Sequence, residues 1–348
     1  MLIYFCVLLI VYCLALIIQF KKLSKKWTIL DIFILLIIII FSSIRYKVGT
    51  DYELYFYTYN YRVSNIFNLN DFYTTSQEFG YYLISWITKK ISSSPYAIFW
   101  TSAIITYIPI YSRLKKETSN FSLAILLFFL LGFYATSFNI IRQSIAIAIN
   151  FYANQYINTE RKKFILLNIV GASFHLSCII VMIIQLIINR IKPTKKFFLF
   201  TVVLAILSVI WIEKFALIFN FIENINPRYL TYFNIHPAGI GLKLLTLLRF
   251  IITIYVFLVT NKNEYHYYKV SLIVSLLFMI MGWYNVFLGR IEIYFSITLL
   301  LLLPEILRKI EIKERILHQY CLNVVFLIVF ILSLIYFGDL VPYKTYLM

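Results

Sequence analysis

Ten ionisable residues stand out because the apolar composition of the chain does not account for them. Charged groups are costly in an apolar medium and usually face a cavity or a partner, so each is a candidate functional residue. The sharpest candidate for proton transfer is His175, because imidazole titrates near neutral pH. For each residue, the structural alternative is a snorkelling side chain or a static ion pair. The ten are Arg45, Asp51, Glu53, Glu78, Arg142, His175, Arg228, Arg249, Arg290 and Glu292.

The elements that must position these residues are membrane-spanning helices. The 348 residues are 62% hydrophobic and 14% charged, with mean hydropathy +0.85. Soluble domains are about 45–50% apolar and about 25% charged, so a soluble globular enzyme is excluded. Apolar runs that approach or reach the length of a ~30 Å hydrocarbon core recur along the chain. We predict an all-α polytopic integral membrane protein with about 12 transmembrane helices, at 2–20, 29–44, 95–112, 121–137, 140–157, 164–174, 176–189, 197–212, 243–260, 270–288, 291–307 and 318–337.

The formal charge of +17 does not indicate a nucleic-acid partner, because the 32 Lys and Arg residues do not form one basic face. Most lie in short clusters between apolar runs, which is typical of cytoplasmic loops. We therefore expect every cluster on the cytoplasmic side and both ends of the chain outside. The clusters lie within 21–26, 113–116, 161–163, 190–196, 262–269 and 308–315.

Two segments strain this topology. Segment 164–189 is long for one span and short for two, so we predict a hairpin of short helices that turns near His175. Segment 79–91 must then be an interfacial or re-entrant helix. In this interpretation residues 1–348 form a single membrane domain, with outer loops at 45–94 and 213–242 that are the expected place of function.

The cysteines of the chain give no metal-binding signature. The sequence has neither a CxxC pair nor a Cys/His cluster at ligand spacing, and the cysteines lie in apolar stretches at Cys6, Cys13, Cys178 and Cys321. The many tyrosines of the first outer loop suit stacking on sugar rings. They equally suit an interfacial aromatic belt, which we favour for most of them.

Short motifs follow one another along nearly the whole chain. They are Arg45-Tyr-Lys-Val-Gly49-Thr-Asp51-Tyr52-x-x-Tyr55, Glu78-Phe-Gly80-Tyr81, Phe138-Asn139-x-x-Arg142-Gln143-x-x-Ala146, Phe174-His175-x-Ser177, Arg290-x-x-x-Tyr294-Phe295, Pro304 and Pro342-Tyr343. Each is weak alone, but the ordered set resembles the EpsG family, Wzy-like membrane proteins of bacterial exopolysaccharide and capsule biosynthesis. One departure is Phe79, where many relatives have proline after the glutamate.

The resemblance implies a polymerase that joins oligosaccharide repeat units carried on polyprenyl pyrophosphate, at the outer face of the bacterial cytoplasmic membrane. It also implies a GT-C-like helical architecture and a membrane glycosyltransferase that works without a metal or another cofactor. Its partners would be the lipid-linked oligosaccharide, membrane lipid and a chain-length regulator protein.

This reaction sets the chemical roles of the candidate residues. A lipid pyrophosphate leaves, so fixed cations must stabilise negative charge, and the acceptor hydroxyl must lose a proton to a base. His175 could instead satisfy backbone groups at a helix break, and Asp51 could pair with Arg45 to order the loop. The candidate bases are His175, Asp51 and Glu78, and the candidates for binding pyrophosphate or substrate are Arg142, Arg45, Arg290, Arg249 and Gln143.

Two other classes of membrane protein compete with a polymerase. A flippase or transporter of lipid-linked oligosaccharide predicts repeated halves and ionisable residues near the midplane of both. No repeat is visible, and the polar residues gather on one side. A membrane acyltransferase predicts a catalytic His on the side where its acyl donor is handled. The polymerase fits the ordered motifs best.

Overall fold

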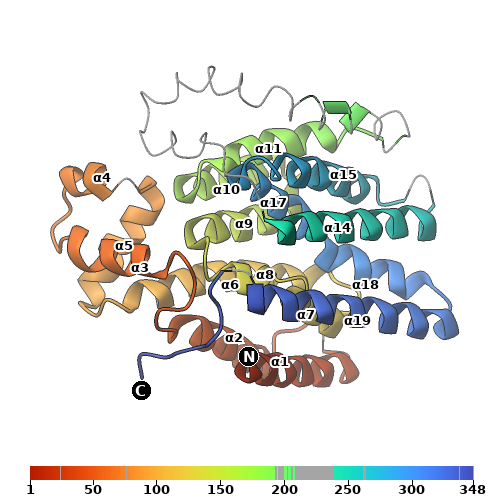
Figure 1. Ribbon diagram of the computed structural model, residues 1–348, viewed down its shortest axis with the longest axis horizontal. Helices are drawn as coiled ribbons and strands as arrows, with labels where there is room; N and C mark the ends of the chain where they lie inside the picture. Colours follow the sequence, from red (N-terminus) through yellow and green to blue (C-terminus); the bar gives the residue numbers. More distant parts are fainter. Residues whose placement is uncertain are drawn as a thin grey trace. The chain divides into compact units, whose positions relative to one another are not determined.

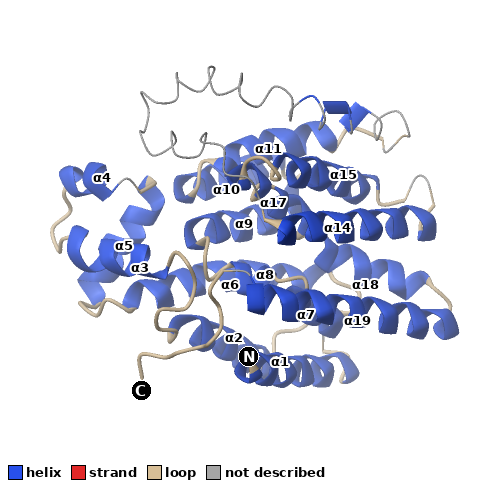
Figure 2. Ribbon diagram, viewed as in Figure 1, coloured by secondary structure: helices blue, strands red, loops and turns tan. Residues whose placement is uncertain are grey.

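The chain folds into helices. The computed structural model describes residues 1–23, 25–75, 77–192, 194, 200–201, 203–204, 207, 239–261, 264–336 and 338–347. Within these residues the structure is all-helical apart from turns, loops and one antiparallel bridge between Arg45 and Thr345 (Figure 2). The chain divides into two compact units: unit 1 is Met1–Ile179 with Leu303–Met348, and unit 2 is Ile180–Leu302.

Unit 1 holds most of the helices. Figure 1 shows α1, α2, α6, α9 and α10 running side by side, with α3, α4 and α5 at one end of them. The bounds are α1 Leu2–Phe20, α2 Ile29–Ser43, α3 Tyr52–Tyr57, the π-helix η1 Thr58–Arg62, α4 Leu69–Thr75, α5 Phe79–Ile91, α6 Ala97–Glu117, α7 Phe121–Leu130, α8 Phe133–Thr136, α9 Ile141–Ala153, the 3₁₀ turn η2 Asn154–Tyr156, α10 Arg161–Phe174 and α19 Ile312–Tyr336.

Unit 2 is built around α15, which packs against α14, α16 and α17. The bounds are α14 Ile240–Val259, α15 His266–Met281, α16 Val286–Gly289 and α17 Glu292–Ser296. Two further helices, α11 Ser177–Ile188 and α18 Leu299–Lys309, cross from one unit to the other.

Among the residues that the structure describes, three helices are long and apolar enough to cross a membrane: α1, α14 and α19. A fourth candidate is the pair Val286–Ser296 and Leu299–Lys309, which is bent by 43° at its break. Helices α2, α7, α11 and α15 are apolar but shorter. These findings support a helical membrane protein, while the number of about 12 spans, the single domain and the GT-C-like arrangement stay predictions.

Several predicted elements are confirmed in the described residues. The helices at 2–20 and 79–91 have the predicted bounds, and a turn at His175 separates α10 from α11. The predicted helix at 121–137 breaks after Leu130 because Gly132 adopts a φ of +80°, a conformation that glycine tolerates. Most of the predicted span 197–212 and of the loop 213–242 lies outside the described residues.

One end of unit 1 gathers basic residues, and we name it the basic end. Lys25 Nζ donates to the carbonyl oxygens of Lys116 and Thr118, at 2.7 and 2.9 Å. The Nζ atoms of Lys116 and Lys163 both lie over the ring of Tyr156, at 5.8 and 3.8 Å from its centroid. Three of the predicted cytoplasmic clusters therefore share one end of the helices, as expected if they face one side of the membrane.

At the other end of unit 1, which we name the tail end, the C-terminal segment 338–347 pairs with the start of the first outer loop. Tyr46 N–H donates to Lys344 O at 2.9 Å, and Gly49 N–H donates to Asp339 O at 3.1 Å. The ring of Tyr343 stacks on Phe41 with 4.2 Å between centroids. This pairing agrees with the prediction that the first outer loop and the C-terminal segment lie on the same side of the membrane.

Candidate active site

Glu78 begins helix α5, yet its carboxylate does not cap the helix. The residue is the N-cap and has extended backbone angles, and its backbone carbonyl accepts from the N–H groups of Tyr81 and Tyr82. An acidic N-cap commonly accepts from the first free N–H groups of its helix. Here no such side-chain bond forms, so the carboxylate is available for contacts with other helices.

The first of these contacts is with Arg142, in the first turn of α9. Arg142 Nη1 forms an ion pair with Glu78 Oε2, and both side chains are nearly buried. The backbone N–H of Arg142 donates to the hydroxyl of Tyr55 at 3.5 Å. Burial raises the pKa of the Tyr55 phenol, while the Arg142 charge opposes that rise and the Asp51 charge adds to it. Tyr55 therefore contacts Arg142 at the start of α9.

The second contact of Glu78 is with His175, whose backbone makes the turn between α10 and α11. His175 N–H donates to Gly171 O, and His175 O accepts from Cys178 N–H, so the backbone serves both helix ends. The imidazole points elsewhere: Nδ1 lies 3.6 Å from Glu78 Oε1. The structural alternative for His175, closing the helix break, is thus met by the main chain, while the ring faces Glu78.

Gly80 permits the approach of α5 to α10 that joins Glu78 to His175. A Cβ atom at this position would lie 2.8 Å from Ser173 O, which is too close for a side chain. On the other side of the site, α9 is tied to α10 by Asn150, whose Nδ2 donates to Asn168 Oδ1 at 2.6 Å. These two contacts hold α5 and α9 against α10.

We name Glu78, Arg142 and His175 the Glu78 cluster. In the sequence, Arg142 lies 64 positions and His175 lies 97 positions after Glu78, yet the three side chains are in contact. The exposed fractions of the side chains are 8% for Arg142, 12% for Glu78 and 21% for His175. The arginine can bind an anion, and the imidazole can accept a proton while the carboxylate orients it. A cluster of this kind suits group transfer with an anionic leaving group.

Unit 2 contains a different ion pair. Arg249 Nη2 lies 4.0 Å from Glu292 Oε1, and Glu292 Oε2 accepts from Ser275 Oγ at 2.9 Å. Arg249 lies in the middle of α14, deeper than the outer position that the sequence predicted. Arg290 follows α16, with its guanidinium 5.1 Å from the ring centroid of Phe287.

Comparison with protein families decides the classification. A family model described as EpsG family matches residues 28–345. The chain belongs to the EpsG family. Membership indicates a membrane-embedded protein with a polymerase-like function in exopolysaccharide production. No curated protein and no solved structure matches the chain.

Within this EpsG-family chain, Arg45 has a different environment from the Glu78 cluster. Its guanidinium lies between the rings of Phe99 and Phe138, at 4.8 and 4.7 Å from their centroids, and donates to Ser42 O and Phe138 O. No ion pair joins it to Asp51 in the described part of the chain. These contacts hold the loop onto α6 and the Phe138 turn, so the loop-ordering role comes from Arg45 without the predicted Asp51 partner.

The remaining predicted residues lie around the cluster. Asp51 precedes α3, where its backbone carbonyl accepts from Tyr55 N–H. Gln143 is buried beside Arg142 in α9. Glu53 forms an exposed pair with Lys47, and Arg228 lies outside the described residues. Among the described residues, no group of three or more His, Cys, Asp or Glu side chains could hold a metal ion.

Two residues of the EpsG-like motifs gain roles that sequence reasoning missed. Tyr55 was assigned to the aromatic belt, but it contacts Arg142. Asn139 accepts from Thr50 N–H at 2.9 Å, and a Cβ on Gly49 would come within 2.6 Å of its Oδ1. Gly49 has a φ of +100° and makes the turn that this contact requires. The sequence feature that could have identified Tyr55 and Asn139 is their position inside the motifs.

Proposed function

We propose that the chain polymerises oligosaccharide repeat units carried on polyprenyl pyrophosphate into exopolysaccharide or capsular polysaccharide. Family membership supports the class of reaction. The observation that carries the proposal is the Glu78 cluster, which places an arginine and an imidazole beside the same carboxylate, the imidazole at 3.6 Å. We assign no role in the transfer reaction to Arg45, because its guanidinium contacts Phe138 O and the ring of Phe99.

The reaction is a displacement at the anomeric carbon of the donor repeat unit. A hydroxyl oxygen of the acceptor sugar forms the new glycosidic bond, the bond from that carbon to the pyrophosphate breaks, and the lipid pyrophosphate leaves with the bonding electrons. The hydroxyl proton moves to a base. The charges to stabilise are therefore negative at the leaving group and positive at the base.

Arg142 is the residue we assign to the pyrophosphate. Its guanidinium has a planar set of donors that matches phosphate oxygens, and the first turn of α9 adds the positive end of a helix dipole. Glu78 holds the guanidinium until substrate binds. Gln143 lies next in α9 and is the second candidate there, whereas Arg249 and Arg290 belong to unit 2.

His175 is the residue we assign as base. Because Nδ1 faces Glu78, the other ring nitrogen, Nε2, is the one that would take the acceptor proton. The Glu78 carboxylate then stabilises the imidazolium that forms, as in other base–carboxylate pairs. Asp51 borders the site through Tyr55 and is the alternative base.

The proposed site faces the outside of the cytoplasmic membrane. The positive-inside rule assigns the basic end to the cytoplasm, and α9 and α10 run from the basic end to the Glu78 cluster. Membrane lipid surrounds the helices in this proposal, and a chain-length regulator protein stays a predicted partner.

Deletion of the gene and analysis of lipid-linked saccharides test the proposed function. We expect single repeat units to accumulate on the outer face of the membrane. Accumulation on the inner face would contradict a polymerase and indicate a flippase, while full-length polymer lacking acyl groups would indicate an acyltransferase. Complementation with Glu160→Gln, a change in an exposed pair at the basic end, controls for expression.

A further inference from the structure

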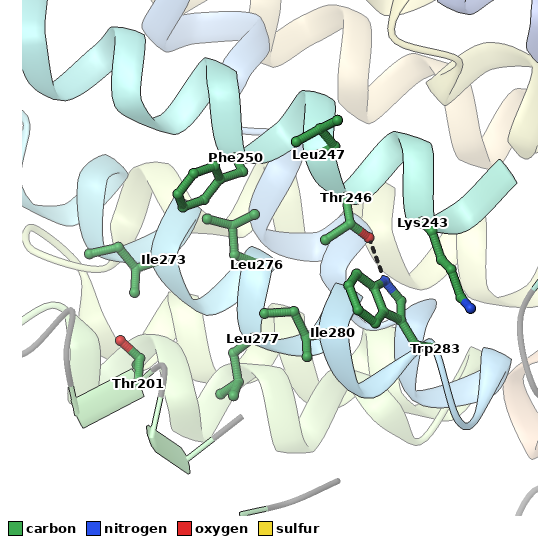
Figure 3. A pocket seen from close by; sticks show the side chains of 10 residues that line it. All are labelled: Thr201, Lys243, Thr246, Leu247, Phe250, Ile273, Leu276, Leu277, Ile280 and Trp283. Atoms are coloured by element: carbon green, nitrogen blue, oxygen red, sulfur yellow. Dashed lines mark hydrogen bonds between the residues drawn. The ribbon is translucent and has the colours of Figure 1, made fainter. Parts of the chain in front are cut away.

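Unit 2 contains a cavity of about 290 Å³ between α14 and α15 (Figure 3). Each helix supplies a stripe of side chains at the spacing of one helix face. The stripe of α14 is Lys243, Thr246, Leu247 and Phe250, and that of α15 is Ile273, Leu276, Leu277 and Ile280, with Trp283 and Thr201 completing the wall.

The wall of this cavity is mostly apolar. The indole Nε1 of Trp283 donates to Thr246 Oγ1 at 3.0 Å, and Thr246 Oγ1 donates to Leu242 O at 2.8 Å, so these polar groups bond within the protein. Aliphatic and aromatic side chains form the rest of the α14 and α15 surfaces. Apolar cavities of ~150 Å³ bind benzene, so this one holds on the order of ten carbon atoms. A sugar would leave its hydroxyl groups unpaired there.

A cation stands at one end of the cavity. Among the described residues of the wall, Lys243 is the one that carries a charge; it is exposed, and Figure 3 shows it at the end opposite to Thr201. It lies in the first turn of the 20-residue helix α14, where the helix dipole also favours an anion. In the predicted topology this turn follows the outer loop 213–242, at the level of lipid headgroups. The arrangement complements a hydrocarbon chain with an anionic head.

We infer that this cavity binds the isoprenoid chain of a polyprenyl phosphate next to its phosphate group, with Lys243 as the counter-ion. Basic residues between membrane helices are a known basis for binding lipid head groups. The inference rests on the proposed function, because that function supplies a polyprenyl carrier where other membrane proteins would meet only acyl lipids.

Photolabelling of the purified full-length chain in nanodiscs tests this site. The probe is a polyprenyl phosphate with a diazirine in the isoprenoid units nearest the phosphate, and the labelled peptides are identified by mass spectrometry. We expect labels on α14 and α15, displaced by unlabelled polyprenyl phosphate and not by phosphatidylglycerol. Equal displacement by both lipids would overturn the inference, because the cavity would then hold bulk lipid.

Three variants sharpen the test. Leu277→Trp fills the cavity from a half-buried position, and Lys243→Glu reverses the charge at an exposed one; we expect each to lower labelling of α14 and α15 at least tenfold. Leu244→Trp adds the same bulk at an exposed position outside the cavity and should leave labelling unchanged. Full labelling of Lys243→Glu overturns the inference even if Leu277→Trp fails to fold.

The labelling result does not depend on polymerisation. If cells without the protein accumulate repeat units inside while labelling stays specific, the proposed function fails and the lipid site stands. If polymerisation is confirmed while labelling is non-specific, the lipid site alone fails.

Discussion

Asp31 and Glu78 are two carboxylates at opposite ends of unit 1, and they differ in how completely they are paired. Asp31, at the basic end, accepts four hydrogen bonds: Oδ2 from the N–H and hydroxyl of Thr28, and Oδ1 from Tyr111 and Lys115. Its side chain is fully buried. Glu78, at the tail end, contacts Arg142 and His175 and keeps some exposure.

The difference separates a structural ion pair from the one that we propose to take part in the reaction. Thr28 and Asp31 form a capping box that begins α2, and Lys115 joins α6 to it at 2.7 Å. Every acceptor position is in use, so this group has little left to offer a substrate. The Glu78 cluster has one anion-binding side chain and one proton acceptor within reach of solvent. Buried charge alone does not mark a catalytic site, and the number of contacts per charge distinguishes the two.

The largest expected effect is on turnover at the tail end. Replacing His175 with Gln removes the base, so we expect polymerisation by the reconstituted protein to fall by ~10²–10⁴-fold. Its main-chain hydrogen bonds stay, so membrane insertion and the thermal midpoint should match wild type. Full activity of this variant together with loss in Asp51→Asn would move the base to the first outer loop.

The second expected effect is on stability at the basic end. Asp31→Asn leaves Lys115 buried without its counter-ion, and breaking such a pair typically costs about 3–5 kcal/mol. We expect low yield and a lower thermal midpoint in detergent, but normal turnover per folded molecule. Normal stability with lost turnover would reverse the roles that we give to the two carboxylates.

The third expected effect concerns the bidentate contact to phosphate. Arg142→Lys keeps the charge next to Glu78 and loses the planar fork, so we expect roughly ten- to a hundredfold less polymer from folded protein. The matched change Arg308→Lys, in an exposed pair with Glu305 in the last turns of α18, should have no effect. Wild-type polymer from Arg142→Lys would make that arginine structural, like Arg45.

The smallest expected effect is the dependence of turnover on pH. A histidine base must be neutral to accept a proton, so the rate should fall as the pH drops below neutrality and the imidazole becomes protonated. A carboxylate base with an ordinary pKa near ~4 would leave the rate flat between about pH 5 and 7. A flat profile would therefore count against His175 and favour Asp51.

Local patterns in the sequence were enough to predict some of the helices and the individual polar residues. Apolar runs gave the bounds of α1 and α5, and the length of segment 164–189 gave the turn at His175. Glu78, Arg142 and His175 were all among the candidates, because a charge in an apolar chain is conspicuous without knowledge of its partner.

What the sequence could not predict is which charges meet. Glu78 and His175 are 97 residues apart, and Asp31 and Lys115 are 84 apart, distances at which no helical or strand periodicity acts. For this reason Lys115 was counted with the solvent-facing basic clusters, although it is buried. Arg45 was grouped with the other arginines because its aromatic neighbours, Phe99 and Phe138, come from distant segments.

The pairing of segment 338–347 with the first outer loop has a consequence for biosynthesis. The hydrogen bond from Gly49 N–H to Asp339 O cannot form until Asp339 has been synthesised. Asp339 follows Gly49 by roughly 290 residues, which corresponds to about 15–60 s at ~5–20 residues per second. Until then Asn139 also lacks its neighbour Gly338. The loop that carries Asp51 and Tyr55 is therefore the last part of unit 1 to be completed, and a stalled or shortened chain would enter the membrane with that loop still open.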